Sequence, residues 1–348
     1  MKTEVQRDKW GIAHVKAPNQ LGAFEAQGWI AASDRIWQME YDRLKSQGRW
    51  GETAGAKAAR EDAFFRRLGL ADLSKQHWES LAQETKEITQ AYARGVNRWL
   101  ETHQDDLPEE FDHHATSPEH WQPWDCLAVY KVRHIFMGTI SRKLWRAFLL
   151  AKGNPELLQA MRGFVDGGST ITTSSLPAAE ELTDLSNLIQ ANSDQLRGLT
   201  DIDGGSNSWA IAGSRTQSGL PLLAGDPHRG IEFPNVYHQF HMECPEFNAI
   251  GLAFPGVPGF PHFGHNDDVA WCITHGMADD TDLFVETDAL EGVEWTSEEL
   301  SLRGEGSFDV FRGSTQHTVT EGTNSLNLRL SPLLDDRELT VPRITRIN

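Results

Sequence analysis

The chain has 348 residues, of which 39% are hydrophobic, and its 32 basic and 50 acidic side chains give a formal net charge of −18. This length suffices for a sizeable buried core, and the acidic balance makes nucleic acid a poor partner, because a phosphate backbone attracts cationic surfaces. No apolar run reaches the length of a membrane span, and three widely spaced cysteines indicate neither a disulfide framework nor a zinc motif.

Residues 1–165 are predicted to form a largely helical region. Apolar and polar residues alternate over 3–17, which favours a strand or hairpin there. Asn19 is a suitable N-cap for a helix that Gly48 would stop. Apolar stripes at helical spacing predict three long helices, over 20–47, 72–102 and 124–152.

The composition changes over residues 166–205, which are rich in Ser, Thr, Asp and Gly. This composition is typical of a linker or a removable spacer. Beyond it, residues 206–348 show the period of β-strands, at about 207–213, 220–225, 235–243, 247–254, 268–274 and 281–287. A helical first half followed by a sheet-rich second half predicts an α+β fold.

The sequence Gly204-Gly205-Ser206 stands where this linker meets the first strand. If the Gly205–Ser206 bond is cut, Ser206 becomes a chain terminus that carries both a hydroxyl nucleophile and an α-amino base. An α-amino group has a pKa of about 7.7–8.0, so it can accept a proton near neutral pH. Taken alone, the tripeptide also fits a plain turn before a strand.

Other motifs accompany this serine in order along the chain. They are Arg7-Asp8-Lys9-Trp10-Gly11-Ile12, Asp34-Arg35-Ile36-Trp37-Gln38-Met39-Glu40, Gly48-Arg49-Trp50-Gly51-Glu52, Gly225-Asp226-Pro227-His228, Phe263-Gly264-His265-Asn266 and Asp279-Asp280-Thr281-Asp282-Leu283-Phe284. Together with Ser206-Asn207-Ser208-Trp209-Ala210-Ile211 they resemble the penicillin acylase family of N-terminal nucleophile hydrolases. The resemblance covers nearly all of residues 4–290.

The resemblance implies a four-layer αββα sandwich, of which this chain would supply part. It also implies a precursor that cuts itself between Gly205 and Ser206, with 166–205 as spacer and the two products held together as a heterodimer. The family's precursors are about twice as long, so we expect this chain to be an N-terminal half or a truncated product. Residues 206–348 would then be the first part of the catalytic chain. No secretory signal is evident at the N-terminus, so the protein stays inside the cell or its leader is missing here.

By the same resemblance, Ser206 is the nucleophile for self-cleavage and for substrate turnover. We expect the first two strands after the linker to be neighbours, which would bring His228 near Ser206. His228 matches a histidine that positions the terminal amine, and histidine suits this work because its charge changes near neutral pH. The backbone N–H of His275 would donate to the oxyanion of the tetrahedral intermediate. A second donor, an asparagine side chain, would lie beyond Asn348. His228 on a surface loop and a pocket-lining His275 side chain are the alternatives.

The sequence offers candidate ligands for two kinds of metal site. Asp279, Thr281 and Asp282 offer oxygen ligands that suit a structural calcium ion, and an acidic turn explains them equally. The resemblance places the completing glutamate near 141–146, where no acidic residue stands. Two histidine pairs invite a zinc site, but residues three apart in a strand face opposite ways. These pairs are His238 with His241, and His262 with His265.

The expected activity is hydrolysis of the amide bond of a small N-acylated substrate, through an acyl-enzyme on Ser206 and without an organic cofactor. Candidate substrates are β-lactams, N-acyl-homoserine lactones and lipopeptides. The aromatic loop 254–261, with residues 135–137, would wall an acyl pocket or belong to the core. A catalytically incompetent fragment that binds ligand and a metal-dependent hydrolase using the histidine pairs are the competing hypotheses.

Overall fold

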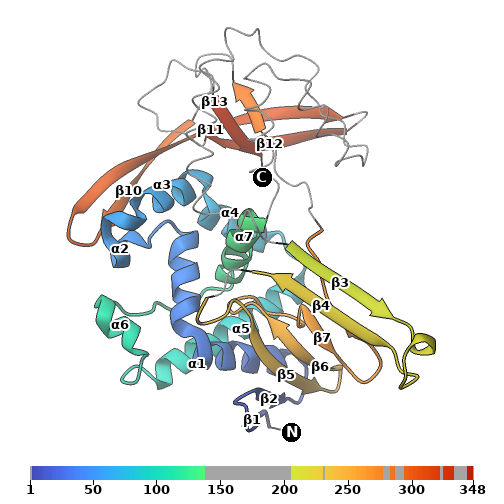
Figure 1. Cartoon of the computed structure of the whole chain (residues 1–348). Coiled ribbons are helices and arrows are strands. Elements are labelled where there is room, and N and C mark those ends of the chain that lie inside the picture. The colour runs from blue at the N-terminus through green and yellow to red at the C-terminus, as the bar shows by residue number, and fades with distance from the viewer. Residues whose placement is uncertain are drawn as a thin grey trace. The chain divides into compact units, whose positions relative to one another are not determined.

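The computed structural model of the chain describes residues 2–137, 205–229, 232–276, 283–286, 294–321, 324–332 and 343–347 (Figure 1). Helices and mixed β-sheets together make this an α+β protein, as predicted. Contacts divide the chain into two compact units, each described by itself below. The first comprises Met1–Ala54, Leu70–His134 and Asp201–Gly276, and the second comprises Gly55–Gly69, Ile135–Thr200 and Met277–Asn348.

Helix α1 (Gln20–Ser46) runs through the centre of the first unit. Its N-terminus is capped as predicted, because the Asn19 side chain accepts the backbone N–H of Gly22 at 2.8 Å. The chain leaves the helix at Gly48, whose φ of 61° lies in the left-handed region that glycine adopts without strain. Both ends of this helix were therefore predictable from local signals.

Helix α1 packs closely against α5 (Gln83–Thr102) at two glycines. A Cβ atom on Gly28 would lie 2.1 Å from the carbonyl oxygen of Tyr92, and one on Gly95 would lie 1.8 Å from that of Glu25. The backbones of the two helices therefore touch, and no larger residue fits at either position.

The single helix predicted over 72–102 is wrong. The chain forms α4 (Leu70–Glu79) and then α5, with a break in which Ala82 adopts an extended ψ of 148°. The indole N–H of Trp78 donates to the Thr89 hydroxyl at 2.9 Å, which draws α4 back onto α5. A continuous helix would forfeit this contact, so tertiary packing overrides the helical periodicity.

Shorter helices complete the helical part, and several of them were not predicted. They are α2 (Gly51–Ala54), the 3₁₀ turn η1 (Gly55–Ala58), α3 (Ala59–Leu68), α6 (Glu109–His114) and α7 (Asp125–Met137). The predicted helix over 124–152 is described as far as α7 extends. Among the described residues, no helix is both long and apolar enough to cross a membrane.

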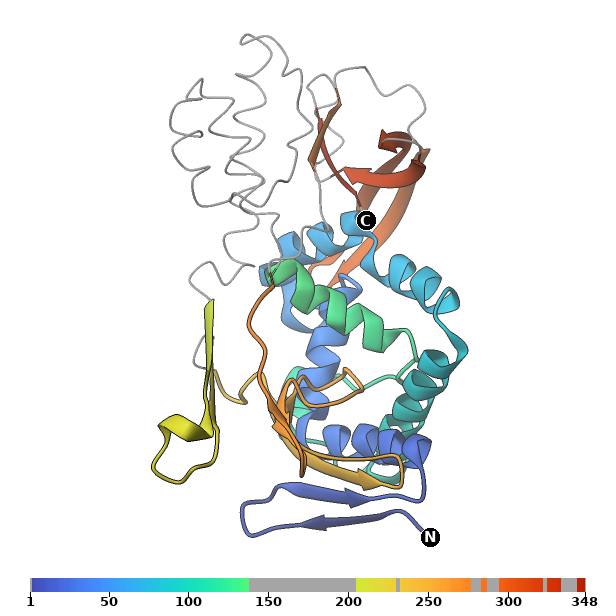
Figure 2. The same cartoon turned by 90° about the vertical axis from the view of Figure 1, so that its right-hand side faces the viewer.

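A six-stranded sheet lies against α1 and α5 in the first unit (Figure 2). Its order is β1 (Glu4–Arg7), β2 (Ala13–Lys16), β5 (His238–Cys244), β6 (Phe247–Ala253), β7 (Phe263–His265) and β8 (Ala270–Trp271). β2 and β5 pair in parallel, whereas the other neighbours are antiparallel. Alternate residues such as Val15, Phe240 and Met242 are buried against Phe24 and Ile30 of α1.

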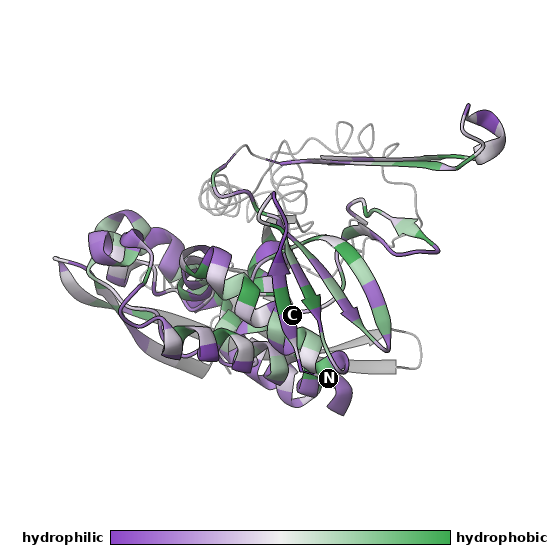
Figure 3. Cartoon of the chain, turned by 90° about the horizontal axis from the view of Figure 1, so that it is seen from below, coloured by the Kyte–Doolittle hydropathy of each residue, from purple (hydrophilic) through white to green (hydrophobic). Residues whose placement is uncertain are grey.

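Two further strands form a hairpin, β3 (Gly205–Ile211) and β4 (Leu222–His228), which pair through all seven residues. Apolar and polar residues are mixed along this hairpin (Figure 3). Its large apolar side chains are exposed, with Trp209 at 51% and Leu222 at 55%. Main-chain pairing, rather than side-chain burial, therefore holds the hairpin together.

The second unit contains α3 and a five-stranded sheet. The strand order is β10 (Glu294–Leu302), β11 (Gly306–Glu321), β12 (Asn324–Pro332), β13 (Arg343–Ile347) and β9 (Leu283–Glu286). Ala63 of α3 packs on the buried Leu300 and Val310, and Arg66 pairs with Glu298 at 3.0 Å. β9 coincides with the strand predicted over 281–287.

In the first unit, the strand predicted over 268–274 is reduced to the short β8.

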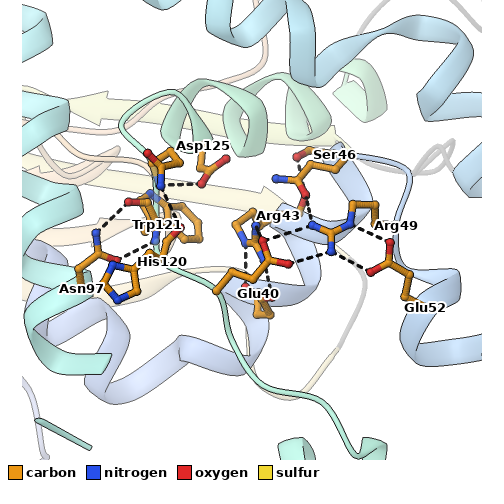
Figure 4. A network of polar contacts seen from close by, with 12 residues as sticks. Glu40, Arg43, Ser46, Arg49, Glu52, Asn97, His120, Trp121 and Asp125 are labelled. Atoms are coloured by element: carbon orange, nitrogen blue, oxygen red, sulfur yellow. Dashed lines mark hydrogen bonds and ion pairs between the residues drawn. The ribbon is translucent and has the colours of Figure 1, made fainter. Parts of the chain in front are cut away.

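An ionic network in the first unit fixes α1 to the segment that leads into α7 (Figure 4). Arg43 is 2% exposed and donates two hydrogen bonds to Glu40, at 2.6 and 2.8 Å, and one to Glu119 at 3.1 Å. Burial raises the pKa of the adjacent Asp125 to about 6. The hydrogen bond from Arg49 lowers the pKa of Glu119 to about 2. Asp125 and Glu119, whose pKa values shift in opposite directions, therefore both interact with Arg43.

Candidate active site

The hairpin brings Ser206 and His228 to the same end of its two strands. Gly205 lies opposite His228 in the antiparallel register, and Ser206 lies opposite Pro227. The prediction that the first two strands after the linker are neighbours is confirmed. Two residues more than twenty positions apart are thus held at adjacent rungs of one ladder by main-chain hydrogen bonds.

The Ser206 side chain faces the peptide bond that precedes it. Its hydroxyl donates a hydrogen bond of 2.6 Å to the carbonyl oxygen of Gly205. Ser206 is half-buried, whereas its neighbours on both sides are exposed. The hydroxyl oxygen is therefore held against the carbonyl group that self-cleavage would require it to attack.

The His228 ring lies over Gly205. Its Nδ1 atom is 3.2 Å from the place that a Cβ atom on Gly205 would occupy, so any side chain at 205 would crowd the ring. Its Nε2 atom lies 3.1 Å from Asp226 Oδ2 and 3.1 Å from Asn207 Nδ2. Nε2 either donates to the Asp226 carboxylate or accepts from the Asn207 amide N–H, but it cannot do both at once. In the tautomer that donates to Asp226, the lone pair lies on Nδ1, the ring nitrogen beside Gly205, and can accept a proton.

Asp226 and Asn207 were not predicted as parts of the site. They are direct partners across the hairpin, and both reach Nε2 of His228. Asp226 stands two residues before His228 in the same strand, and residues two apart share a face. Applied to Gly225-Asp226-Pro227-His228, that periodicity would have indicated Asp226, whereas Asn207 follows only once the register is known.

His275 lies in the segment that follows β8 and is half-buried. Among the described residues, no hydrogen bond joins it to Ser206 or His228. Cys272 of the same segment does touch the hairpin, since its sulfur lies 2.9 Å from the Ser208 hydroxyl and 3.5 Å from the Ala224 carbonyl oxygen. The segment carrying His275 therefore leaves the sheet close to the strand that begins with the nucleophile.

The predicted calcium ligands Asp279, Thr281 and Asp282 lie outside the described residues. Within the described part of the chain, no three or more His, Cys, Asp or Glu side chains gather as a metal-binding group. The suggested zinc pair in β5 is separated as predicted. His238 points inward and hydrogen bonds to Asp34 at 2.9 Å, whereas His241 lies on the opposite face.

Half of the aromatic loop 254–261 is buried, whereas its Phe260 is 51% exposed. Phe254 is buried and stacks on Tyr237 with ring centroids 5.0 Å apart. Gly256 donates to the Tyr92 hydroxyl at 2.9 Å, and Gly259 and Gln27 exchange two hydrogen bonds. The loop is therefore anchored to α1 and α5.

Comparison with known proteins gives one family over most of the chain. The penicillin amidase family matches residues 2–304. Penicillin acylase 2 proenzyme from Pseudomonas sp. (strain SE83) is 39% identical over an alignment 328 residues long, which covers 88% of this chain and 42% of that protein. Acyl-homoserine lactone acylase QuiP from Pseudomonas aeruginosa is 28% identical, over 81% of this chain and 34% of that protein.

The chain thus spans less than half the length of these relatives. Among solved structures, a thermostable penicillin G acylase from Alcaligenes faecalis aligns with a TM-score of 0.40 and 23% identity. That alignment covers 51% of this chain and 97% of the other.

Proposed function

The chain belongs to the penicillin amidase family, and on that premise we propose that it is the part of an amide hydrolase that generates and carries the nucleophile. The substrate class is a small N-acylated molecule. This class is common to a relative named as a penicillin acylase and one named as an acyl-homoserine lactone acylase. The hydrogen bond from the Ser206 hydroxyl to the Gly205 carbonyl oxygen, under the His228 ring, carries the proposal.

Self-cleavage begins with attack of Ser206 Oγ on the carbonyl carbon of Gly205. The hydroxyl proton passes to a base, for which His228 Nδ1, beside Gly205, is the candidate, and the Gly205–Ser206 C–N bond breaks as nitrogen takes a proton. The product is an ester between Gly205 and the Ser206 side chain. Water hydrolyses this ester, which leaves a carboxylate on Gly205 and a free α-amino group and hydroxyl on Ser206.

Turnover then repeats the chemistry on an external amide. The α-amino group of Ser206 accepts the hydroxyl proton as Oγ attacks the acyl carbon, and the amine of the substrate leaves with that proton. Asp226 and Asn207 orient His228, and the N–H of His275 is the proposed donor to the oxyanion. Cleavage divides the chain into one product that ends at Gly205 and another that begins at Ser206. The two products remain together as a heterodimer.

The experiment is intact mass and N-terminal sequencing of the chain and of variants at two serines of the same strand. Wild type should yield a product that begins Ser-Asn-Ser-Trp. Ser206→Cys should process slowly, and Ser206→Ala should remain uncut and without amidase activity, because alanine has no nucleophile. Ser208→Ala, which removes the neighbouring hydroxyl, should still be cleaved.

Cleavage of the Ser206→Ala variant at the same bond would mean that an external protease cuts the chain. An uncut wild-type chain that hydrolyses N-acyl substrates would contradict the proposed nucleophile. A panel of N-acylated β-lactams and N-acyl-homoserine lactones then distinguishes the two substrate classes.

A further inference from the structure

Two histidines meet on the outer face of the six-stranded sheet, away from the active site. His14 of β2 and His241 of β5 are direct partners in the parallel register, while their neighbours Ala13 and Val15 point into the core. Their Nδ1 atoms are 2.9 Å apart, and their rings meet at 80° with centroids 5.1 Å apart. Neither residue takes part in the proposed hydrolysis.

The remaining nitrogen of each ring already lies beside an oxygen that accepts a hydrogen bond. His241 Nε2 lies 2.7 Å from the side-chain oxygen of Asn248, and an amide oxygen can only accept. Nε2 of His241 must therefore carry the hydrogen, which leaves the lone pair of the neutral ring on Nδ1.

Asp8 plays the same part for His14, whose Nε2 lies 3.5 Å from its Oδ2. The backbone N–H groups of Trp10 and Ile12 donate to Asp8 Oδ1 at 2.8 and 3.0 Å, which favours the carboxylate form. The carboxylate can only accept, so it places the hydrogen of His14 on Nε2. Each imidazole is thus oriented by an oxygen behind it, the arrangement that protein metal sites use to fix a ligand histidine.

With the hydrogens on Nε2, the two Nδ1 lone pairs face each other at 2.9 Å, a spacing that a shared proton or a metal ion between them stabilises. We propose that His14 and His241 bind a divalent transition-metal ion of tetragonal geometry, Cu²⁺ or Ni²⁺, with solvent in the remaining positions. With metal–nitrogen bonds of about 2.0–2.1 Å, ligands at a right angle lie about 2.9 Å apart, whereas tetrahedral ligands lie about 3.3–3.4 Å apart. The observed spacing matches the right angle that Cu²⁺ and Ni²⁺ prefer.

The charges around the pair suit this ion. Asp8 supplies a negative charge behind His14. The next pair on the same face of these strands is the ion pair of Lys16 with Glu243, at 3.0 Å, which is neutral as a whole. The bound ion would tie β2 to β5, and under the proposed cleavage those strands belong to different chains.

The test is Cu²⁺ electron paramagnetic resonance and Ni²⁺ titration calorimetry on the full chain, with excess glycine to suppress weak sites. Wild type should show coupling to two imidazole nitrogens and one Ni²⁺ per chain. His14→Ala and His241→Ala should each lose the two-nitrogen signal and bind Ni²⁺ more than about tenfold more weakly. Asn248→Ala, which removes only the orienting oxygen, should weaken binding by roughly tenfold or more.

His113→Ala is the matched control, because this histidine is exposed on the short helix α6 and should change neither readout. Circular dichroism without metal verifies that each variant is folded. Affinity equal in His14→Ala and wild type, or a wild-type signal from a single nitrogen, would overturn the proposal. So would a pair that responds to pH alone and takes up no metal in glycine.

Discussion

The helical core around α1 and the β3–β4 hairpin are held together by different forces. Ile30 and Met39 of α1 are fully buried, whereas Trp209 and Leu222 of the hairpin are more than half exposed. Burying a large apolar side chain contributes about 1.5–3 kcal/mol, so the core carries the stability of the first unit. The hairpin instead depends on its ladder of main-chain hydrogen bonds and on contacts such as Ser208 with Cys272.

The ion pairs of the two regions differ in the same way. Arg43 and Glu40 are almost entirely shielded from water, while His228 and Asp226 are about half exposed. Removing one partner of a buried pair leaves an uncompensated charge, whereas solvent screens an exposed one. The proposed chemistry therefore lies where substitutions should change reactivity and spare the fold, and the ionic network lies where they should do the reverse.

The largest expected effect on stability comes from removing the buried charge of Arg43. Arg43→Met leaves Glu40 buried without a cation and should lower the free energy of unfolding by about 3–5 kcal/mol. Arg49→Met, at a partly exposed arginine that pairs with Glu52 and Glu119, should cost at most about 1 kcal/mol. Urea unfolding of both variants measures the difference, and equal costs would show that burial does not set the strength of this network.

A smaller effect is the pH-dependent contribution of Asp125 to the free energy of unfolding. Burial raises the pKa of Asp125 from 3.8 to about 6, so between these values the folded state binds more protons than the unfolded state. Stability therefore falls as pH rises through this window, and the loss is complete above it. Asp125→Asn should remove that loss. Between pH 4 and 7 its free energy of unfolding should therefore rise relative to that of wild type by on the order of 2–3 kcal/mol.

The measurement is urea unfolding of wild type and Asp125→Asn across this range. Asparagine retains an oxygen that can accept the N–H of Gln122, which Asp125 binds at 2.8 Å. A difference between the two proteins that stays constant with pH would contradict the assignment of this carboxyl group.

The smallest effect is expected in the hairpin. Trp209→Ala should change the free energy of unfolding by no more than about 0.5 kcal/mol, because the indole is exposed and little burial is lost. Thermal or urea unfolding checks this value, and a cost comparable to that of a core residue would show that the hairpin is packed in solution.

Local chemistry determined what could be predicted from the sequence. Asn19 caps the following helix and Gly48 ends it, because both act within a few residues. The alternation of apolar residues located the strands that became β3 to β6, and adjacency of the first two placed His228 opposite Gly205. Each of these features depends on spacing along a short stretch of chain.

Features that join distant residues were decided by the tertiary structure. The Trp78 contact with Thr89 breaks the predicted long helix, and α3 packs on strands more than 200 residues later. The parallel pairing of β2 with β5 brings His14 to His241, and the hairpin register brings Asn207 to His228. No local periodicity predicts these long-range contacts. Loop closure and burial select the partners only when the whole core forms.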